Sequence, residues 1–389
     1  MRALIILSLS ASVAFADSYT HPSEAKVKFP DGEKQLRAVR ELLLKEYADE
    51  NLDENDLYRG AIAGMLHAAG NRKWDELLSP AELADLETSL AGETVGIGII
   101  MKVEPDLVTI LRPVSGSPAE RAGVRAGDRI LKVDGRSLRG PHMDDVMRSI
   151  RGKPGDPVQL TILRDDDVVT VSIKRAPIVF PTVMRVSLPG GVELVQLRIF
   201  NEKTAPLLKS ALRDIAGQKP RGVIVDLREN MGGLFDKLID CASLFLPKGA
   251  TIVEEVERGG HAKQVRSNGD PILSGVPIAV LADETTASSA ELLAGALRDQ
   301  LGARIVGGHT AGKWNVQKVE KLSNGWGIKY TIGVFRTAKG QSPDGKGIEP
   351  DVPVAMDAGA VEKAVVVTEP AARLQADAQL RAAIALLNR

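Results

Sequence analysis

Residues 276–301 are the strongest guide to the fold class, because they read as a buried strand, a turn and a helix in succession. Residues 276–282 (VPIAVLA) form a short apolar run typical of a buried strand, and residues 283–286 (DETT) are polar and suited to a turn. Leucine and alanine then recur at helical spacing between residues 292 and 301. A second apolar run, residues 222–227, also ends in a polar turn. Buried strands that lead into helices indicate an α/β domain.

Ser288 lies at the turn between this strand and this helix, where its hydroxyl can project from the helix start. The amide of Ser289 has no partner within the first helical turn, so it can face a developing oxyanion. Gly232 and Gly233 follow the run at residues 222–227 and offer another amide, because adjacent glycines let the backbone approach a ligand closely. A plain glycine turn is the alternative for this pair.

Lys313 is the candidate base for Ser288. A serine hydroxyl is a poor nucleophile until a base takes its proton, and a desolvated lysine can act as that base. A free lysine titrates near pH ~10.4, so half neutrality at pH 7 requires its pKa to fall by about 3.4, or roughly 4.6 kcal/mol. Such changes occur in deeply buried groups, so the hypothesis requires an apolar pocket around Lys313. Taken alone, a serine and a lysine are ordinarily surface residues.

Two other chemistries match parts of the same region. Residues 307–313 have the glycine spacing of a phosphate-binding loop, but Trp314 stands where Ser or Thr would hold magnesium. Residues 314–322 also alternate like a strand rather than the required helix. His309 leaves a Ser/His/Asp triad as the second alternative. The five histidines are scattered without metal-ligand spacing, so the sequence predicts no metal site.

Four ordered motifs resemble those of one family, the carboxy-terminal processing peptidases, also called tail-specific proteases. They are DLRxNxGG at residues 226–233, the segment at residues 286–299, GKxxVQ at residues 312–317 and GKGIEPD at residues 345–351. The resemblance extends over most of the mature chain. It implies a crotonase-like serine peptidase core of the α/β class that needs no metal or organic cofactor.

The resemblance also implies a role for each site residue. The nucleophile is Ser288, the general base is Lys313, and Gln317 orients the lysine. Gln317 lies four residues after Lys313, either on the same side of a helical turn or along an extended segment. The family's oxyanion hole is made of backbone amides, which map onto Ser289 and one of Gly232 and Gly233.

Three departures from the family pattern leave alternatives open. The usual SASAS reads TASSA at residues 286–290, so Ser289 is a competing nucleophile. Gly308 replaces the usual glutamate and Ala311 the usual phenylalanine, which alters the wall of the lysine pocket. The alternative function is therefore a catalytically silent scaffold that binds protein C-termini, in which the lysine stays hydrated and charged.

A second unit upstream resembles a PDZ domain, which is mainly β with helices. Residues 95–100 (VGIGII) begin a strand, and residues 117–135 (SPAERAGVRAGDRILKVDG) follow. Such a domain holds a terminal carboxylate with backbone amides and adds the bound peptide to a sheet edge, here beside a helix at residues 143–150. The resemblance places the peptide-binding segment at Gly96, Ile97, Gly98 and Ile99. We therefore expect partner proteins with accessible C-terminal tails.

The start of the chain predicts export. Arg2 precedes an apolar stretch, residues 3–15, and the sequence AFA suits cleavage after Ala16. The stretch is too short to favour a spanning helix, so we expect an exported protein, with the periplasm as its first expected location. Cys241 is the only cysteine, which rules out an internal disulfide, and its helical setting predicts a buried apolar role.

These units divide the chain into a signal peptide (1–16), a helical N-terminal region (17–92), an inserted PDZ domain (93–176), a peptidase core (177–365) and a C-terminal helix (366–389). With 44% hydrophobic residues and a formal charge of −1, the chain can bury a large core, and no basic patch points to nucleic acid. The working hypothesis is an exported serine endopeptidase that captures C-terminal tails and cuts near them by a Ser/Lys mechanism. An adaptor or regulatory protein, a homo-oligomer and the effect of the PDZ domain on activity stay open.

Overall fold

The computed structural model describes residues 29–49, 51–70, 74–90, 94–104, 107–114, 116–138, 146, 149–178, 182–356, 360 and 369–388. The expected signal peptide and its cleavage site lie outside these residues. The described helices are α1 (Gly32–Glu46), α2 (Glu54–Gly70), α3 (Pro80–Leu90), α4 (Pro118–Arg121), α6 (Thr204–Gly217), α7 (Phe235–Ser243), α8 (Ser289–Leu301), α10 (Pro370–Ala376) and α11 (Ala378–Leu387). None of them is long and apolar enough to cross a lipid bilayer.

The described strands are β1 (Glu76–Leu78), β2 (Thr94–Gly96), β3 (Ile99–Glu104), β4 (Leu107–Pro113), β5 (Arg129–Val133), β6 (Arg136–Ser137), β7 (Pro157–Arg164), β8 (Asp167–Lys174), β9 (Ala176–Ile178), β10 (Val183–Leu188), β11 (Val192–Leu197), β12 (Gly222–Asp226), β13 (Thr251–Glu257), β14 (Ala262–Arg266), β15 (Ile278–Ala282), β16 (Arg304–Gly307), β17 (Asn315–Lys321), β18 (Gly327–Thr337) and β19 (Val352–Pro353). The chain divides into two compact units, and the boundary between them in the sequence falls between Met65 and Leu66.

The first unit contains α1 and most of α2, as the helical pattern of the N-terminal region predicts. Among the described residues of these two helices, none is fully buried. The apolar side chains Leu36 and Val39 of α1 remain about half exposed, at 52% each. Their apolar face is therefore uncovered within the unit itself.

The N-terminal region is not purely helical, which the sequence pattern did not predict. Strand β1 pairs antiparallel with β18, so that Glu76 lies opposite Lys329. Three residues are too few to show a period of two, which explains why the pattern did not reveal β1. This strand fixes residues 74–78 at the edge of a sheet of the second unit.

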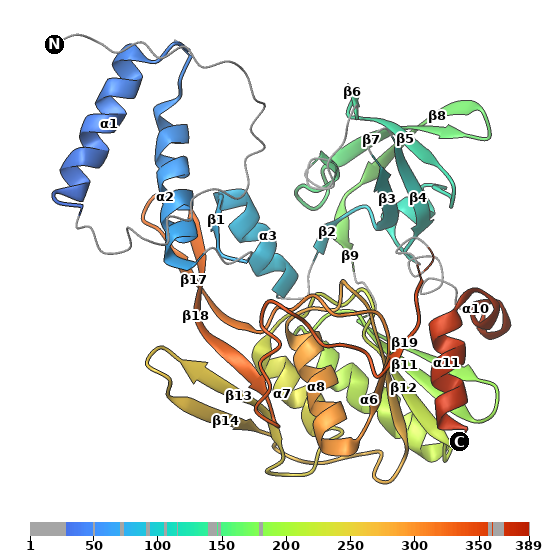
Figure 1. The fold of residues 1–389 in the computed structure, drawn as a ribbon. Helices are drawn as coiled ribbons and strands as arrows, with labels where there is room; N and C mark the ends of the chain where they lie inside the picture. The colour runs from blue at the N-terminus through green and yellow to red at the C-terminus, as the bar shows by residue number, and fades with distance from the viewer. Residues whose placement is uncertain are drawn as a thin grey trace. The chain divides into compact units, whose positions relative to one another are not determined.

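The PDZ-like part of the chain is built from two small sheets (Figure 1). One is a five-stranded path in the order β3-β4-β5-β7-β8, with β6 paired to β5, and the other joins β2 to β9. Fully buried Ile110, Leu160 and Ile162 form the centre of its core. Most of the expected flanking helix at residues 143–150 lies outside the described residues.

The remaining core contains a six-stranded sheet in the order β10-β11-β12-β15-β16-β19, parallel from β11 onward (Figure 1). Alternate side chains of β12 point to opposite faces, as the pleat requires. Val223 and Val225 pack with residues of α6, α7 and α8. Ile224 packs with Leu380 of α11 on the other face. The sheet is thus covered by helices on both sides, in agreement with the predicted α/β class.

A second sheet of the core has the order β1-β18-β13-β14, with β17 also paired to β18. Strand β17 begins two residues after Lys313 and carries Gln317. Of the two geometries considered for this pair of residues, the extended one is therefore correct.

The C-terminal segment forms two helices where the sequence predicted one. Helix α10 ends before Asp377, whose side chain caps the start of α11 by accepting a hydrogen bond from Leu380 N at 2.9 Å. Helix α11 packs on β12, β15 and β16. The C-terminal segment therefore contacts the peptidase core of its own chain.

Candidate active site

Ser288 occupies the turn between β15 and α8, as the apolar and helical patterns predicted. Its backbone has φ 52 and ψ −127, a conformation that a non-glycine residue rarely adopts and that surrounding contacts must hold. Its amide donates to Glu291 Oε2 at 3.0 Å. The preceding Ala287 donates its amide to Asn230 O at 2.9 Å. The nucleophile turn is therefore fixed both to its own helix and to the loop after β12.

Gly232 and Gly233 lie directly against this turn. A Cβ on Gly232 would lie 2.8 Å from Ser288 Cβ and 3.0 Å from Ser289 N, and a Cβ on Gly233 would lie 2.1 Å from Phe200 O. Their φ values of 99 and 138 also favour glycine. The structure thus brings together the residues predicted for the oxyanion hole, and the need for glycine here is steric.

The amides of Gly232 and Gly233 differ in their hydrogen bonding. The amide of Gly232 donates to Asn230 Oδ1 at 2.9 Å. Within the described residues no acceptor is assigned to the amide of Gly233 or to that of Ser289 at the start of α8. The Ser289 hydroxyl donates to Gly233 O at 3.0 Å, so it holds the glycine loop.

Lys313 is half-buried beneath an aromatic ring. Its Nζ lies 4.9 Å from the centroid of the Trp74 ring. Burial, and secondarily the nearby charge of Lys329, lower the pKa of Lys313 to about 8, against the weaker opposing effects of Glu76 and Glu291. No hydrogen bond joins Ser288 Oγ to Lys313 Nζ in the described structure. Catalytic hydrogen bonds in ligand-free sites are often long and tighten on substrate binding.

Trp74 is the residue that sequence reasoning missed. Its position relative to Lys313 depends on β1, which holds the segment at the edge of the sheet that also contains β17. An aromatic side chain two residues before the strand was the only signal in the sequence. The effect of the replacements at Gly308 and Ala311 on the lysine pocket stays a prediction, whereas the indole of Trp74 lies over the amine.

Gln317 contacts this same segment. Its Nε2 donates to Trp74 O at 2.6 Å and lies 3.4 Å from Asp75 Oδ1. Thr331 Oγ1 also donates to Asp75 Oδ1, at 2.7 Å. The described contacts of the Gln317 side chain are therefore with Trp74 and Asp75, the segment that includes the residue over Lys313, and its role in orienting the lysine stays a prediction.

Glu291 connects the candidate nucleophile Ser288 to the candidate base Lys313. The carboxylate is fully buried and accepts five hydrogen bonds, from Ser288 N (3.0 Å), Gly312 N (2.9 Å), Lys313 N (2.8 Å), Thr310 Oγ1 (2.5 Å) and Trp314 Nε1 (3.2 Å). Burial raises the pKa of Glu291, and these donors oppose the rise. The sequence pattern S-x-x-E at residues 288–291 is a capping-box signal that could have identified this contact.

The predicted peptide-binding segment of the PDZ-like part is a loop between two strands. Gly96 ends β2 and Ile99 begins β3, while the side chain of Ile97 is buried in the core. The carbonyl of Ile97 accepts a hydrogen bond from Ala119 N at 2.8 Å. The carbonyl of Gly98 accepts from Ser117 Oγ at 3.0 Å. Peptide binding by this loop stays a prediction.

The rival chemistries gain no support from the geometry. The segment after Lys313 is strand β17, whereas a phosphate-binding loop requires a helix there. The ring Nδ1 of His309 lies 3.1 Å from Thr310 O, which is its assigned polar contact. Cys241 is fully buried in α7, as its pattern predicted, and burial raises the pKa of its thiol to about 12. Among the described residues, no group of three or more His, Cys, Asp or Glu could hold a metal ion.

Comparison with known proteins supports the same class of protein. Residues 191–354 match Peptidase family S41, and residues 109–164 match a PDZ domain. A probable CtpA-like serine protease of Staphylococcus haemolyticus is 30% identical over 362 residues, which are 90% of this chain and 71% of the relative. One from Staphylococcus aureus strain COL is 32% identical over 82% of this chain. This chain spans 64% of the length of that relative.

Two solved structures have a similar fold. The photosystem II D1 C-terminal processing protease has a TM-score of 0.55 at 27% identity, over 90% of this chain and 92% of that one. A putative S41 protease from Bacteroides fragilis has a TM-score of 0.58 at 17% identity, over 93% and 98%, which supports the fold alone. The fold and the serine at its strand-to-helix turn are thus similar to those of PDZ-containing peptidases. The chain belongs to peptidase family S41, the carboxy-terminal processing peptidases, as the motifs predicted.

Proposed function

We propose that this protein is a serine endopeptidase in which Ser288 is the nucleophile and Lys313 the general base. The observation that carries the proposal is the burial of Lys313 under Trp74, which lowers the pKa of the lysine to about 8. Near neutral pH a useful fraction of the amine is then unprotonated. Glu291 supports the pairing because it binds the backbones of both residues.

The reaction follows from these positions. Neutral Lys313 takes the proton of Ser288 Oγ as this oxygen bonds to the scissile carbonyl carbon. The resulting oxyanion receives hydrogen bonds from the amides of Ser289 and Gly233, since the amide of Gly232 is already used by Asn230. The protonated lysine then gives its proton to the departing amine. Water, deprotonated by the same lysine, hydrolyses the acyl-enzyme.

We further propose that the substrates are proteins with accessible C-terminal tails. Support comes from the PDZ match at residues 109–164 and from the similarity to a protease that is named for C-terminal processing. The residues assigned to tail binding are Gly96, Ile97, Gly98 and Ile99. The short apolar start of the sequence supports export. A fusion of residues 1–28 to a reporter that is active only outside the cytoplasm tests that part.

The experiment is cleavage of an unstructured protein with an apolar C-terminal tail. We expect wild type to cut near the tail, and Ser288→Ala and Lys313→Ala to be inactive while still binding it. Ser289→Ala should lose only part of the activity, because its hydroxyl holds the glycine loop through Gly233 O and is not the nucleophile. If Ser288→Ala were active and Ser289→Ala inactive, the assigned nucleophile would be wrong.

A scaffold that only binds C-termini is the second candidate. The observation in its favour is that Ser288 and Lys313 are not hydrogen-bonded to each other in the described structure. A wild-type protein that binds the tail but leaves it intact, under conditions in which a relative cuts it, would establish this function instead.

A further inference from the structure

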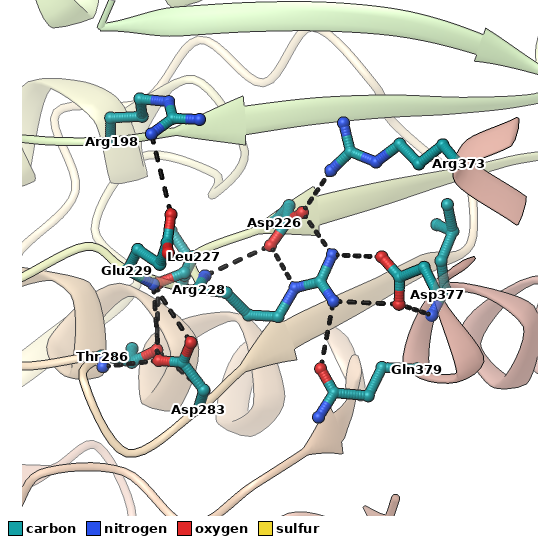
Figure 2. A network of polar contacts seen from close by, with 11 residues as sticks. Arg198, Asp226, Leu227, Arg228, Glu229, Asp283, Thr286, Arg373, Asp377 and Gln379 are labelled. Atoms are coloured by element: carbon teal, nitrogen blue, oxygen red, sulfur yellow. Dashed lines mark hydrogen bonds and ion pairs between the residues drawn. The ribbon is translucent and has the colours of Figure 1, made fainter. Parts of the chain in front are cut away.

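Arg228 lies in the turn that leads from β12 to the oxyanion glycines, and it is completely buried. Its Nε and Nη2 donate to the two oxygens of Asp226 at 2.9 and 2.8 Å. Its Nη1 and Nη2 donate to the two oxygens of Asp377 at 3.0 and 2.7 Å. Gln379 Oε1 accepts a further bond at 3.1 Å. All five guanidinium N–H groups are thus satisfied, two carboxylates being bound in bidentate fashion (Figure 2).

This cluster joins segments that are far apart in the sequence. Asp226 ends a central strand, whereas Asp377 separates α10 from α11. Arg373 of α10 also donates to Asp226 Oδ2, at 2.9 Å. Two arginines and two aspartates are therefore buried together with balanced charge. Burial alone would raise the pKa of Asp226, but Arg228 and Arg373 hold it below its ordinary value.

The other side of the same turn is bonded to the nucleophile turn. The amide of Glu229 points at the carboxylate of Asp283, with N–O distances of 3.4 and 3.3 Å, and Thr286 Oγ1 donates to Leu227 O at 2.9 Å (Figure 2). Glu229 has φ 61, so its backbone needs support from neighbours. The turn at residues 227–230 is thus held between the C-terminal helices and the residues that precede Ser288.

We propose that Asp377 is a positioning residue of the active site. Through Arg228, the C-terminal helices fix the turn at residues 227–230 and with it the amide of Gly233. The inference rests on the proposed peptidase function and deepens it, because it makes residues 369–388 a working part of the catalytic centre. Asp377 itself does not touch the substrate.

The geometry allows a selective variant. Asn caps helix starts as well as Asp does, so Asp377→Asn keeps the cap of α11. It removes the negative charge and turns an NH2 group toward the arginine, which disrupts one bidentate pair. The matched control is Glu369→Gln, which alters the exposed cap of α10 without contacting Arg228.

We expect Asp377→Asn to lower kcat by about tenfold to a hundredfold with little change in KM, since small displacements of oxyanion donors cost that much. Its affinity for a peptide boronate, whose serine adduct carries a negative oxygen, should fall by the same factor as kcat/KM. Glu369→Gln should match wild type in all three. A milder variant, Gln379→Ala, should give a smaller loss of kcat in the same direction, and it serves if Asp377→Asn fails to fold.

The outcomes separate the two proposals. If the variants melt at lower temperature but keep wild-type kcat and boronate affinity well below their melting points, Asp377 is only structural and the inference is wrong. If wild type itself is inert, the proposed function is wrong, and this inference, which rests on it, is wrong as well. An active wild type with a selective loss of kcat in Asp377→Asn supports both.

Discussion

The side chain of Lys313 is half-buried, and this burial disfavours its charged form, although the face of the Trp74 ring 4.9 Å from Nζ attracts a cation. With its pKa lowered to about 8, roughly a tenth of the lysine is neutral at pH 7. At the ordinary value of 10.5 the neutral fraction would be roughly 300-fold smaller. Burial of this amine therefore decides how much neutral lysine the site contains at physiological pH.

This predicts a distinctive pH dependence. Because the neutral amine is the base, kcat/KM should rise with pH, reach half its plateau near pH 8, and level off above it. Trp74→Ala lets water reach Nζ, so its half-maximum should move to higher pH and its activity at pH 7 should fall. Trp74→Phe keeps an aromatic cover and is the control. A wild-type profile that rises only near pH 10 would contradict the depressed pKa, and an unmoved Trp74→Ala profile would contradict the role of the indole.

The turn after β12 requires glycine because two backbone segments pack closely against each other there. Gly233 forms a bridge with Phe200, and the backbones approach so closely that no Cβ fits between them. The carbonyl of Gly233 also accepts a hydrogen bond from Ser289 Oγ at 3.0 Å, so the same loop contacts the helix start beside Ser288. Backbone proximity, rather than flexibility, is what glycine contributes here.

We predict that Gly233→Ala lowers kcat by at least about a hundredfold, the loss typical of a missing oxyanion donor. The new Cβ would lie 2.1 Å from Phe200 O, so the loop must move. Gly249→Ala is a matched control, because Gly249 also has a positive φ, of 84, but nothing within 4 Å of its would-be Cβ. Steady-state kinetics and thermal melting of both variants would check this. Equal losses of activity in the two variants would assign the effect to backbone strain alone.

The elements differ in how far the sequence could predict them. The strand, turn and helix around Ser288 were predictable, because periodicity and polar breaks are local signals. The place of Gln317 on an extended segment was left as one of two alternatives and settled by the pairing of β17 with β18. The cover of Lys313 by Trp74 was not predictable, because it depends on β1 pairing with a strand that is distant in the sequence. Glu291 could be recognised from the sequence as a capping residue, but its hydrogen bonds to Gly312 and Lys313 could not be predicted.

The stability of the protein should depend on pH through the buried Lys313. The pKa of Lys313 is lower in the folded state than in the unfolded chain, so between pH 10.5 and pH 8 only the unfolded chain gains a proton as the pH falls. Folding stability is lost across that window, by about 3 kcal/mol in total, and the loss persists below it.

Lys313→Met should therefore be inactive but more stable than wild type, by about 1–3 kcal/mol at pH 7, with the difference vanishing near pH 10.5 and above. Urea unfolding of both proteins at the two pH values measures it. Lys321→Met, at the exposed end of β17, is the control and should show no such dependence. A variant no more stable than wild type at pH 7 would mean that Lys313 is well solvated.

The contact between Arg228 and Asp377 can form only late in synthesis of the chain, which proceeds from the N-terminus. Ser288 and Lys313 both precede Asp377, so a growing chain contains its nucleophile and its base before the residue that fixes its oxyanion turn. Synthesis at about 5–20 residues per second separates these events by several seconds. On our proposal, an incomplete chain of this peptidase has no peptidase activity during that interval. Proteins that are synthesised beside it are therefore not cleaved.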